Sequence, residues 1–176
     1  EAILPSEEEF KKCFPEYFLF FRPRDIVSGD FYWLSSQKEK TILAIADCTG
    51  HGVPGAFMSM IGNTLMNEIV NEKKVFQPSE ILNQLNSGIV HALHQESRSQ
   101  DDGMDISVCL FDNEKNTITF AGANHSMYIV QDGFLKELHG DIYSIGSMFG
   151  KKDVAFTQKE IPFSKGMTLY FSTDGF

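Results

Sequence analysis

The pattern of hydrophobic and polar positions first predicts a β-hairpin. Short apolar runs at residues 31–34 and 41–46 flank a polar stretch, which is typical of two antiparallel strands joined by a tight turn. If the turn is centred near residues 38–39, Asp30 and Asp47 lie opposite each other, with Cβ atoms about 5 Å apart. Two like charges placed this way repel, so the hairpin predicts a bound cation.

Two helices are predicted in the middle of the chain. The first starts near Pro54 and the second near Pro78, since proline is favoured at the first position of a helix. Each carries an apolar stripe at helical spacing, and we expect the first helix to run for about five turns and to be mostly buried. The stripe residues are Phe57, Ile61, Leu65 and Ile69 in the first helix, and Ile81, Leu82, Leu85, Ile89 and Leu93 in the second.

The remaining apolar runs are short and separated by turn residues, which predicts strands. The continuous run at residues 106–111 is typical of a buried strand, and Asp132-Gly133 is a tight hairpin signal. Further strands are predicted at residues 17–21, 117–121, 127–130, 134–138, 154–161 and 167–172. Two central helices between two sets of antiparallel strands predict an α+β fold built of packed layers.

Composition narrows the class of protein. The chain has 176 residues and a formal charge of −9, which argues against nucleic acid or an anionic membrane as the main partner. No apolar run reaches the roughly 20 residues that direct membrane insertion requires. Three scattered cysteines, Cys13, Cys48 and Cys109, provide neither a disulfide framework nor a zinc ligand set, which favours a cytoplasmic location.

Both ends of the sequence have features that are typical of a truncated chain. The sequence opens on Glu1 without a methionine, and it closes on Phe176 directly after an apolar strand. We therefore expect a fragment of a longer protein. Residues 1–12 are expected to be the end of an upstream linker, and residues 13–176 a domain that is incomplete at its C-terminus.

Four aspartates share a position at the end of a predicted strand: Asp30, Asp47, Asp105 and Asp174. Hard oxygen ligands of this kind suit Mg²⁺ or Mn²⁺, and two such ions about 4 Å apart activate water and hold a phosphoryl group. An aspartate at a strand end is also ordinary turn chemistry, and this is the preferred interpretation for any one of them alone. For the opposed pair Asp30 and Asp47 the metal interpretation is preferred, because like charges in register are destabilising.

The loop after the hairpin contains Gly50, His51 and Gly52. The glycines allow positive φ and a close approach of the backbone to a ligand. Either backbone carbonyls complete an ion's shell, or amides cradle a phosphate ahead of the helix. The absence of a Walker-type lysine disfavours nucleotide binding. His51 either donates a proton to a leaving group or, as is commoner between two glycines, orders the loop.

Other catalytic arrangements are disfavoured. No Gly-x-Ser-x-Gly turn is present, so a serine hydrolase lacks its nucleophile elbow. Asp47 beside Cys48 raises the pKa of the thiol, which is the wrong direction for a nucleophile. His91 and His94 lie three residues apart, but no third ligand is near in sequence, so a solvated or half-buried helix face is preferred over a metal pair.

Four segments, in this order, carry a family resemblance: DIVSGDFY at residues 25–32, ADCTGHGVPGA at 46–56, AGANH at 121–125 and STDG at 172–175. With them the chain resembles the SpoIIE-type branch of the metal-dependent (PPM, type 2C) protein serine/threonine phosphatases. The resemblance implies a four-layer α/β/β/α sandwich of antiparallel sheets with a dinuclear Mn²⁺ or Mg²⁺ site. It also implies that a water bridging both ions attacks phosphoserine or phosphothreonine directly, without a phosphoenzyme.

The resemblance also implies roles for individual residues. Asp47 would bridge both ions, Asp30 and the backbone carbonyl of Cys48 would bind one ion, and Asp174 would bind the other. Asp105 is a weaker ligand candidate, because many relatives carry threonine or another residue there. By analogy with the wider superfamily, Arg24 would contact the substrate phosphate. Asn124 and His125 lie either near an accessory-metal position or, as is preferred, in a structural turn.

One departure from the family pattern concerns the C-terminus. The family has a helix and a closing strand with a further metal-binding aspartate after the Thr-Asp-Gly motif, whereas this chain stops at Phe176. The resemblance therefore implies a metal site that is only partly contained in this chain.

The sequence leads to one functional hypothesis and one alternative. The leading hypothesis is the phosphatase effector domain of a bacterial signalling protein. Its substrate would be a phosphorylated regulator such as a STAS-domain anti-anti-sigma factor in a partner-switching circuit. An upstream sensor, membrane-bound in some architectures, would control the domain, and a homodimer is a further expectation. The alternative is a pseudophosphatase-like module that binds a phosphoprotein without turning it over.

Overall fold

Two antiparallel sheets pack face to face in the computed structural model, which describes residues 3–23, 27–93, 102–146 and 155–174. The larger sheet has the strand order β1-β2-β3-β4-β7, and the smaller one β6-β5-β8. The strands are β1 (Phe31–Gln37), β2 (Lys40–Cys48), β3 (Met104–Asp112), β4 (Thr117–Ala123), β5 (Met127–Gln131), β6 (Phe134–Leu138), β7 (Lys159–Pro162) and β8 (Thr168–Tyr170). The helices are α1 (Glu7–Cys13), α2 (Gly52–Met66), the π-helix η1 (Asn67–Glu72) and α3 (Pro78–Ala92).

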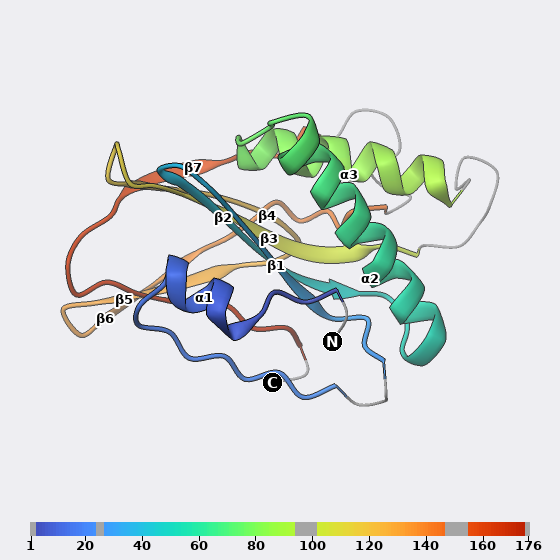
Figure 1. The fold of residues 1–176 in the computed structure, drawn as a ribbon, viewed down its shortest axis with the longest axis horizontal. Coiled ribbons are helices and arrows are strands. Elements are labelled where there is room, and N and C mark those ends of the chain that lie inside the picture. The colour runs from blue at the N-terminus through green and yellow to red at the C-terminus, as the bar shows by residue number, and fades with distance from the viewer. Residues whose placement is uncertain (1–2, 24–26, 94–101, 147–154, 175–176) are drawn as a thin grey trace.

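The large sheet is covered on both faces. Helices α2 and α3 lie on one side of it, and β5 and β6 lie on the other (Figure 1). Alternate residues of β3 reach the two cores: Ile106 and Val108 pack with the helices, whereas Cys109 packs with the small sheet. This two-sided burial confirms the strand predicted from the continuous apolar run at residues 106–111.

The layered α+β fold is confirmed, with three layers in the order α/β/β. The small sheet leaves Phe134, Leu135 and Tyr170 exposed, at 79%, 68% and 53%. Within the described ranges no helix covers that face, so the fourth layer of the expected sandwich has no counterpart there. None of the helices in the same ranges has the length and hydropathy needed to cross a bilayer.

The hairpin has the predicted register. Phe31 pairs with Ala46 and Gln37 pairs with Lys40, so the turn is formed by Lys38 and Glu39. The turn at Asp132-Gly133 is also confirmed, since both residues have positive φ and join β5 to β6. The turn residues in the sequence therefore predict the position of the turn correctly in both hairpins.

Helix α2 forms where it was predicted, but its first turns bury other side chains than expected. Phe57 is 61% exposed, whereas Met58, Gly62 and Met66 are buried. The helix packs through small side chains: a Cβ atom at Gly62 would lie 3.0 Å from the ring of Phe31 and 2.9 Å from Met104 Cε. The expected stripe was therefore wrong at Phe57, but it is confirmed at Ile69, which is buried, and Ile61 and Leu65 pack partly buried against the same core. The stripe of α3 is confirmed, because Ile81, Leu82, Leu85 and Ile89 are all fully buried.

The edge strand predicted at residues 17–21 was wrong, since this segment is irregular in the structure. Tyr17 stacks on Phe10, and Phe21 packs edge-on against Tyr32. Ring contacts therefore hold the segment in place of ladder hydrogen bonds. The strand expected at residues 154–161 begins only at Lys159, and residue 154 lies outside the described ranges.

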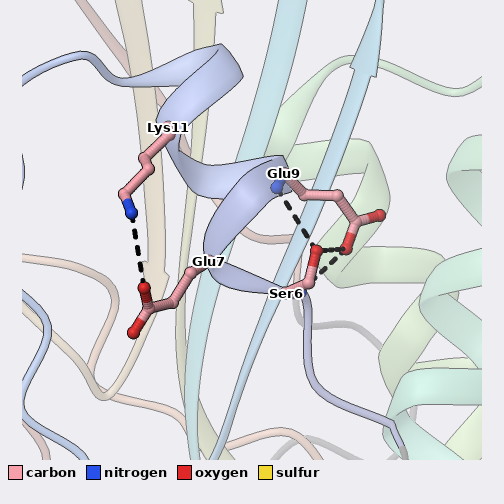
Figure 2. A network of polar contacts seen from close by, with 4 residues as sticks. All are labelled: Ser6, Glu7, Glu9 and Lys11. Atoms are coloured by element: carbon pink, nitrogen blue, oxygen red, sulfur yellow. Dashed lines mark hydrogen bonds and ion pairs between the residues drawn. The ribbon is translucent and has the colours of Figure 1, made fainter.

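Helix α1 was not expected within residues 1–12. Ser6 caps it: its hydroxyl accepts a hydrogen bond from the Glu9 amide, and the Glu9 carboxylate accepts one from the Ser6 amide (Figure 2). Lys11 lies 3.5 Å from Glu7 on the exposed side of the helix. Phe10 is buried against Tyr32 of β1. Part of the expected linker is thus packed helix, while the domain boundary itself stays a prediction.

Candidate metal centre

The candidate ligands gather at one end of the large sheet. Asp47 lies near the end of β2 and Asp105 near the start of β3, and these two residues are direct partners in the antiparallel ladder. Asp30 immediately precedes β1, so continuing the β1–β2 register places it beside Asp47 on the other side. Three aspartates from neighbouring segments therefore lie at this end of the sheet.

Asp174 reaches the same edge from the small sheet. The segment that follows β8 crosses to the end of the large sheet, where the amide of Asp174 donates a hydrogen bond of 3.4 Å to Asp47 Oδ2. The hydroxyl of Thr173 donates one of 2.9 Å to Asp30 Oδ2. Two segments separated by more than 120 residues of sequence are joined in this way at the candidate site.

Backbone carbonyls of the glycine loop lie close to Gly29, next to Asp30. A Cβ atom at Gly29 would lie 3.0 Å from the carbonyl oxygens of both Cys48 and Gly50, so only glycine fits beside them. Gly50 and Gly52 have φ of 85° and 62°, which confirms the predicted positive φ in this loop. The loop thus packs its backbone closely against the segment that carries Asp30.

The electrostatics of the site are those of crowded negative charge. Burial, followed by the charges of Asp30 and Asp174, raises the pKa of Asp47 to about 6. Across the described ranges, no ion pair with lysine or arginine offsets these carboxylates. Within the same ranges, no three His, Cys, Asp or Glu side chains are close enough together to hold a metal ion as they stand. A hard, oxygen-only donor set with excess negative charge fits a divalent cation.

Asp105 is held by two neighbours that the sequence did not reveal. Its carboxylate accepts hydrogen bonds from the hydroxyl of Ser144 and from the amide of Asn124, the latter at 2.8 Å. Asn124 follows β4, and extending the β3–β4 register places it opposite Asp105, so the hairpin around residues 113–116 carried a usable signal. Because both oxygens already accept a hydrogen bond, Asp105 is less available as a ligand than Asp47.

Two of the other predicted residues, Arg24 and His94, lie outside the residues that the structure describes. His51 is exposed at the N-cap of α2, and its side chain makes no capping hydrogen bond to the helix. Burial, followed by the charges of Asp30 and Asp47, raises the pKa of the Cys48 thiol, which agrees with its exclusion as a nucleophile.

The raised pKa of Asp47 predicts a pH-dependent stability for the metal-free protein. Between its unfolded value of 3.8 and about 6, the native state binds more protons than the unfolded state, so the free energy of unfolding falls as the pH rises. Asp47→Asn removes this penalty. The full shift corresponds to about 3 kcal/mol, reduced to about 1 kcal/mol by solvent screening at this half-buried position.

Urea unfolding in the presence of EDTA measures this effect. At pH 7.5 we expect Asp47→Asn to be more stable than the wild type, and the difference should narrow towards pH 4. Asp132→Asn in the β5–β6 turn is the control, since asparagine also tolerates the positive φ there. A stability difference between Asp47→Asn and the wild type that does not change with pH would contradict a raised pKa of Asp47 in the native state.

The comparison with protein families decides the assignment. The sequence model described as "Stage II sporulation protein E (SpoIIE)" matches residues 37–176. The chain belongs to the SpoIIE family. This match covers the second strand of the hairpin, both central helices and the strands from β2 to β8, and the resemblance inferred from the four motifs is confirmed.

Relatives of this SpoIIE-family chain include named phosphatases. It is 27% identical over 159 residues to the phosphoserine phosphatase RsbU of Bacillus subtilis, an alignment that covers 87% of this chain and 44% of RsbU. The SiaA-PP2C domain of Pseudomonas aeruginosa superposes with a TM-score of 0.86 at 32% identity, covering 99% of this chain and 67% of that one. The chain thus spans less than half the length of the curated relative it matches.

A second solved structure supports the fold. RsbX in complex with magnesium superposes with a TM-score of 0.67 at 16% identity, covering 86% of this chain and 69% of that one. The SpoIIE-family chain therefore has the PP2C phosphatase fold, and one protein with this fold has been captured with a divalent metal.

Proposed function

We propose that this chain is the catalytic part of a metal-dependent protein serine/threonine phosphatase. The observation that carries the proposal is the convergence of Asp30, Asp47 and Asp174 from three separate segments at one sheet end, with no lysine or arginine ion pair to them within the described ranges. Membership of the SpoIIE family, together with relatives named as phosphatases, supports the same activity.

Each residue has a proposed role at the centre. Asp47 would bind two Mn²⁺ or Mg²⁺ ions, Asp30 and the Cys48 carbonyl would complete the shell of one, and Asp174 would bind the other. When bound, such ions supply activated water and neutralise phosphoryl charge. Asp105 would be a weaker ligand, and Arg24 would bind the substrate phosphate. Thr173 orients Asp30 by donating to its Oδ2, which leaves Oδ1 for a ligand.

The proposed substrate is a phosphorylated regulatory protein, with a STAS-domain regulator as the specific candidate. RsbU is named as a phosphoserine phosphatase, which supports phosphoserine as the substrate group. We further propose a cytoplasmic location, control by an upstream sensor domain, and a homodimeric assembly. Residues 13–176 would form most of the phosphatase domain.

The test is phosphate release from a serine-phosphorylated STAS-domain protein, measured with the longer protein that carries this chain. We expect hydrolysis in Mn²⁺ or Mg²⁺, loss of hydrolysis in EDTA, and recovery when the metal is added back. A phosphotyrosine protein serves as the substrate control and should not be hydrolysed. Hydrolysis that persists unchanged in EDTA would overturn the metal-dependent mechanism.

A binding module is the alternative outcome of the same experiment. If the protein binds the phosphorylated regulator tightly in the presence of metal but releases no phosphate, the phosphatase proposal fails and the pseudophosphatase interpretation takes its place. Measuring binding and turnover on one preparation separates the two functions directly.

A further inference from the structure

His125 connects the two sheets beside the candidate metal centre. Its Nε2 lies 2.8 Å from the backbone carbonyl oxygen of Ser172, and its Nδ1 contacts the hydroxyl of Ser107 on β3. A carbonyl oxygen only accepts hydrogen bonds, so Nε2 carries the proton. Nδ1 of the neutral ring then accepts, and the Ser107 hydroxyl donates. One tautomer of a neutral imidazole therefore satisfies both contacts.

The backbone of His125 is tightly enclosed. A Cβ atom at Gly122 would lie 2.1 Å from the His125 carbonyl oxygen, and one at Gly140 would lie 2.6 Å from it. The preceding residue, Asn124, has a φ of 47°, and its backbone amide donates a hydrogen bond of 2.7 Å to the backbone carbonyl of Asp141. The imidazole thus projects from a turn that close backbone packing holds in place.

The segment that His125 contacts lies beyond the last strand of the small sheet, and Phe171 packs it against the core between the two sheets. Strand β8 ends at Tyr170, so the ladder of the small sheet does not extend to residues 171–174. Ser172 is exposed, and the two residues that follow it make the contacts to Asp30 and Asp47. The position of Thr173 and Asp174 therefore depends on where Ser172 is held.

We propose that His125 is a positioning residue that anchors the segment carrying Thr173 and Asp174 to the large sheet. The anchor runs from Ser107 on β3 through the imidazole to the Ser172 carbonyl. The inferred effect on metal binding rests on the proposed function, because it assumes that Asp174 is a ligand. The anchoring contact itself does not depend on that assumption.

A role for His125 as a metal ligand or proton donor fits the structure less well. Both ring nitrogens already have hydrogen-bond partners, Ser107 and Ser172. Burial lowers the pKa of the imidazole, so the ring is neutral at neutral pH. A neutral ring with two engaged nitrogens is suited to holding a backbone segment rather than to exchanging protons.

The first test of the anchor is the tautomer of the His125 imidazole. Nitrogen-15 NMR of the histidine side chains, in the protein that carries this chain, distinguishes a protonated Nε2 from a protonated Nδ1. We expect the Nε2–H form for His125, assigned by its loss in His125→Gln. A protonated Nδ1, or fast averaging between the two forms, would overturn the proposal.

Two variants test the consequence for the metal centre. His125→Gln places an amide nitrogen near the position of Nε2 and keeps a donor for Ser172, whereas His125→Asn places its amide near Nδ1 and reaches only Ser107. We expect His125→Asn to weaken Mn²⁺ binding by about tenfold in calorimetric titration, as for other residues that orient ligands. His125→Gln should recover most of the wild-type affinity.

Two further results separate this inference from the proposed function. If His125→Asn and His125→Gln bind Mn²⁺ as tightly as the wild type does, the anchor is wrong while the metal function stands. If the wild type itself binds no Mn²⁺, the metal function fails, and the tautomer measured by NMR alone decides the anchor. Thermal unfolding in EDTA should give both variants similar midpoints, which excludes a general folding defect as the cause.

Discussion

Asp47→Asn is expected to lower kcat for phosphoserine hydrolysis by about 10³-fold, since loss of several kcal/mol of metal-dependent transition-state stabilisation corresponds to about three factors of ten. The position is central because the charges of both Asp30 and Asp174 act on the carboxylate of Asp47, which also accepts a hydrogen bond from the Asp174 backbone amide. Asparagine has nearly the same shape but lacks the charge. The variant therefore tests charge at the bridging position while disturbing the packing least.

The matched comparison is Asp105→Asn. Asp105 pairs directly with Asp47 in the ladder, but its oxygens already accept hydrogen bonds from Ser144 and Asn124. We expect a loss of about tenfold, in the range reported for residues around a metal site. Steady-state kinetics at saturating Mn²⁺ measure both variants, and equal losses in the two would contradict the bridging role of Asp47.

Stability and activity should change in opposite directions in Asp47→Asn. Without metal, the variant is expected to be more stable than the wild type at pH 7.5, because the crowded carboxylate is gone. With Mn²⁺, only the wild type should gain substantial stability. A ligand that binds only the native state raises the free energy of unfolding, and the gain grows with the logarithm of the ratio of ligand concentration to Kd. A loss of activity in a more stable protein excludes unfolding as its cause.

The sequence was sufficient for the two tight hairpins, whereas it did not lead us to expect α1, although the Ser6–Glu9 capping box is a local signal. The turn at Lys38 and Glu39 fixed the register of the first hairpin, and this register placed Asp30 beside Asp47. The pairing of Asp47 with Asp105 was not accessible in this way. The two strands are separated by α2, η1 and α3, so no local turn determines their register.

The misjudged position of Phe57 in α2 has a physical cause in the size of the residues through which the helix contacts the sheet. Periodicity gave weight to large side chains such as Phe57, whereas the helix approaches the sheet through Gly55, Ser59 and Gly62. At Gly62 the rings and methyl groups of the sheet occupy the space that a side chain would take. A stripe of small residues marks a close approach, and hydrophobicity alone does not detect it.

The contacts of the Thr-Asp-Gly segment were also beyond the sequence. The motif placed Asp174 among the candidate ligands through family resemblance, but the hydrogen bond from Thr173 to Asp30 joins two sheets. Such a contact depends on how the sheets pack, which the sequence does not specify at the level of single atoms. Tertiary packing thus decides how the site is assembled.

Gly103→Ala is expected to be the most destabilising single-methyl change near the site. A Cβ atom at Gly103 would lie 1.9 Å from the backbone oxygen of Ile145, a fully buried residue. Met104 and Ile145 exchange two backbone hydrogen bonds of 3.0 and 2.9 Å at the same place, so neither segment can move freely. We expect a loss of about 3 kcal/mol, which is at the upper end for overpacking.

The same change should also disturb the candidate centre. The Gly103 carbonyl accepts hydrogen bonds from the amide and hydroxyl of Thr49, which begins the glycine loop. On the other side, Ile145 follows Ser144, whose hydroxyl donates to Asp105. Separating the two segments therefore displaces both the loop and a partner of Asp105. We expect weaker Mn²⁺ binding in calorimetric titration at a temperature where the variant remains folded.

Gly88→Ala is the control for Gly103→Ala, because its added methyl group meets only the flexible end of Leu65, at 2.9 Å. Gly88 lies within α3, where alanine is favoured over glycine by about 1 kcal/mol, which offsets the crowding. For a chain of this size, 3 kcal/mol corresponds to a fall in Tm of about 6–12 °C, whereas the control should change little. Equal midpoints for the two variants in thermal unfolding would show that the strand edge at Gly103 is not the rigid support that the close backbone contact implies.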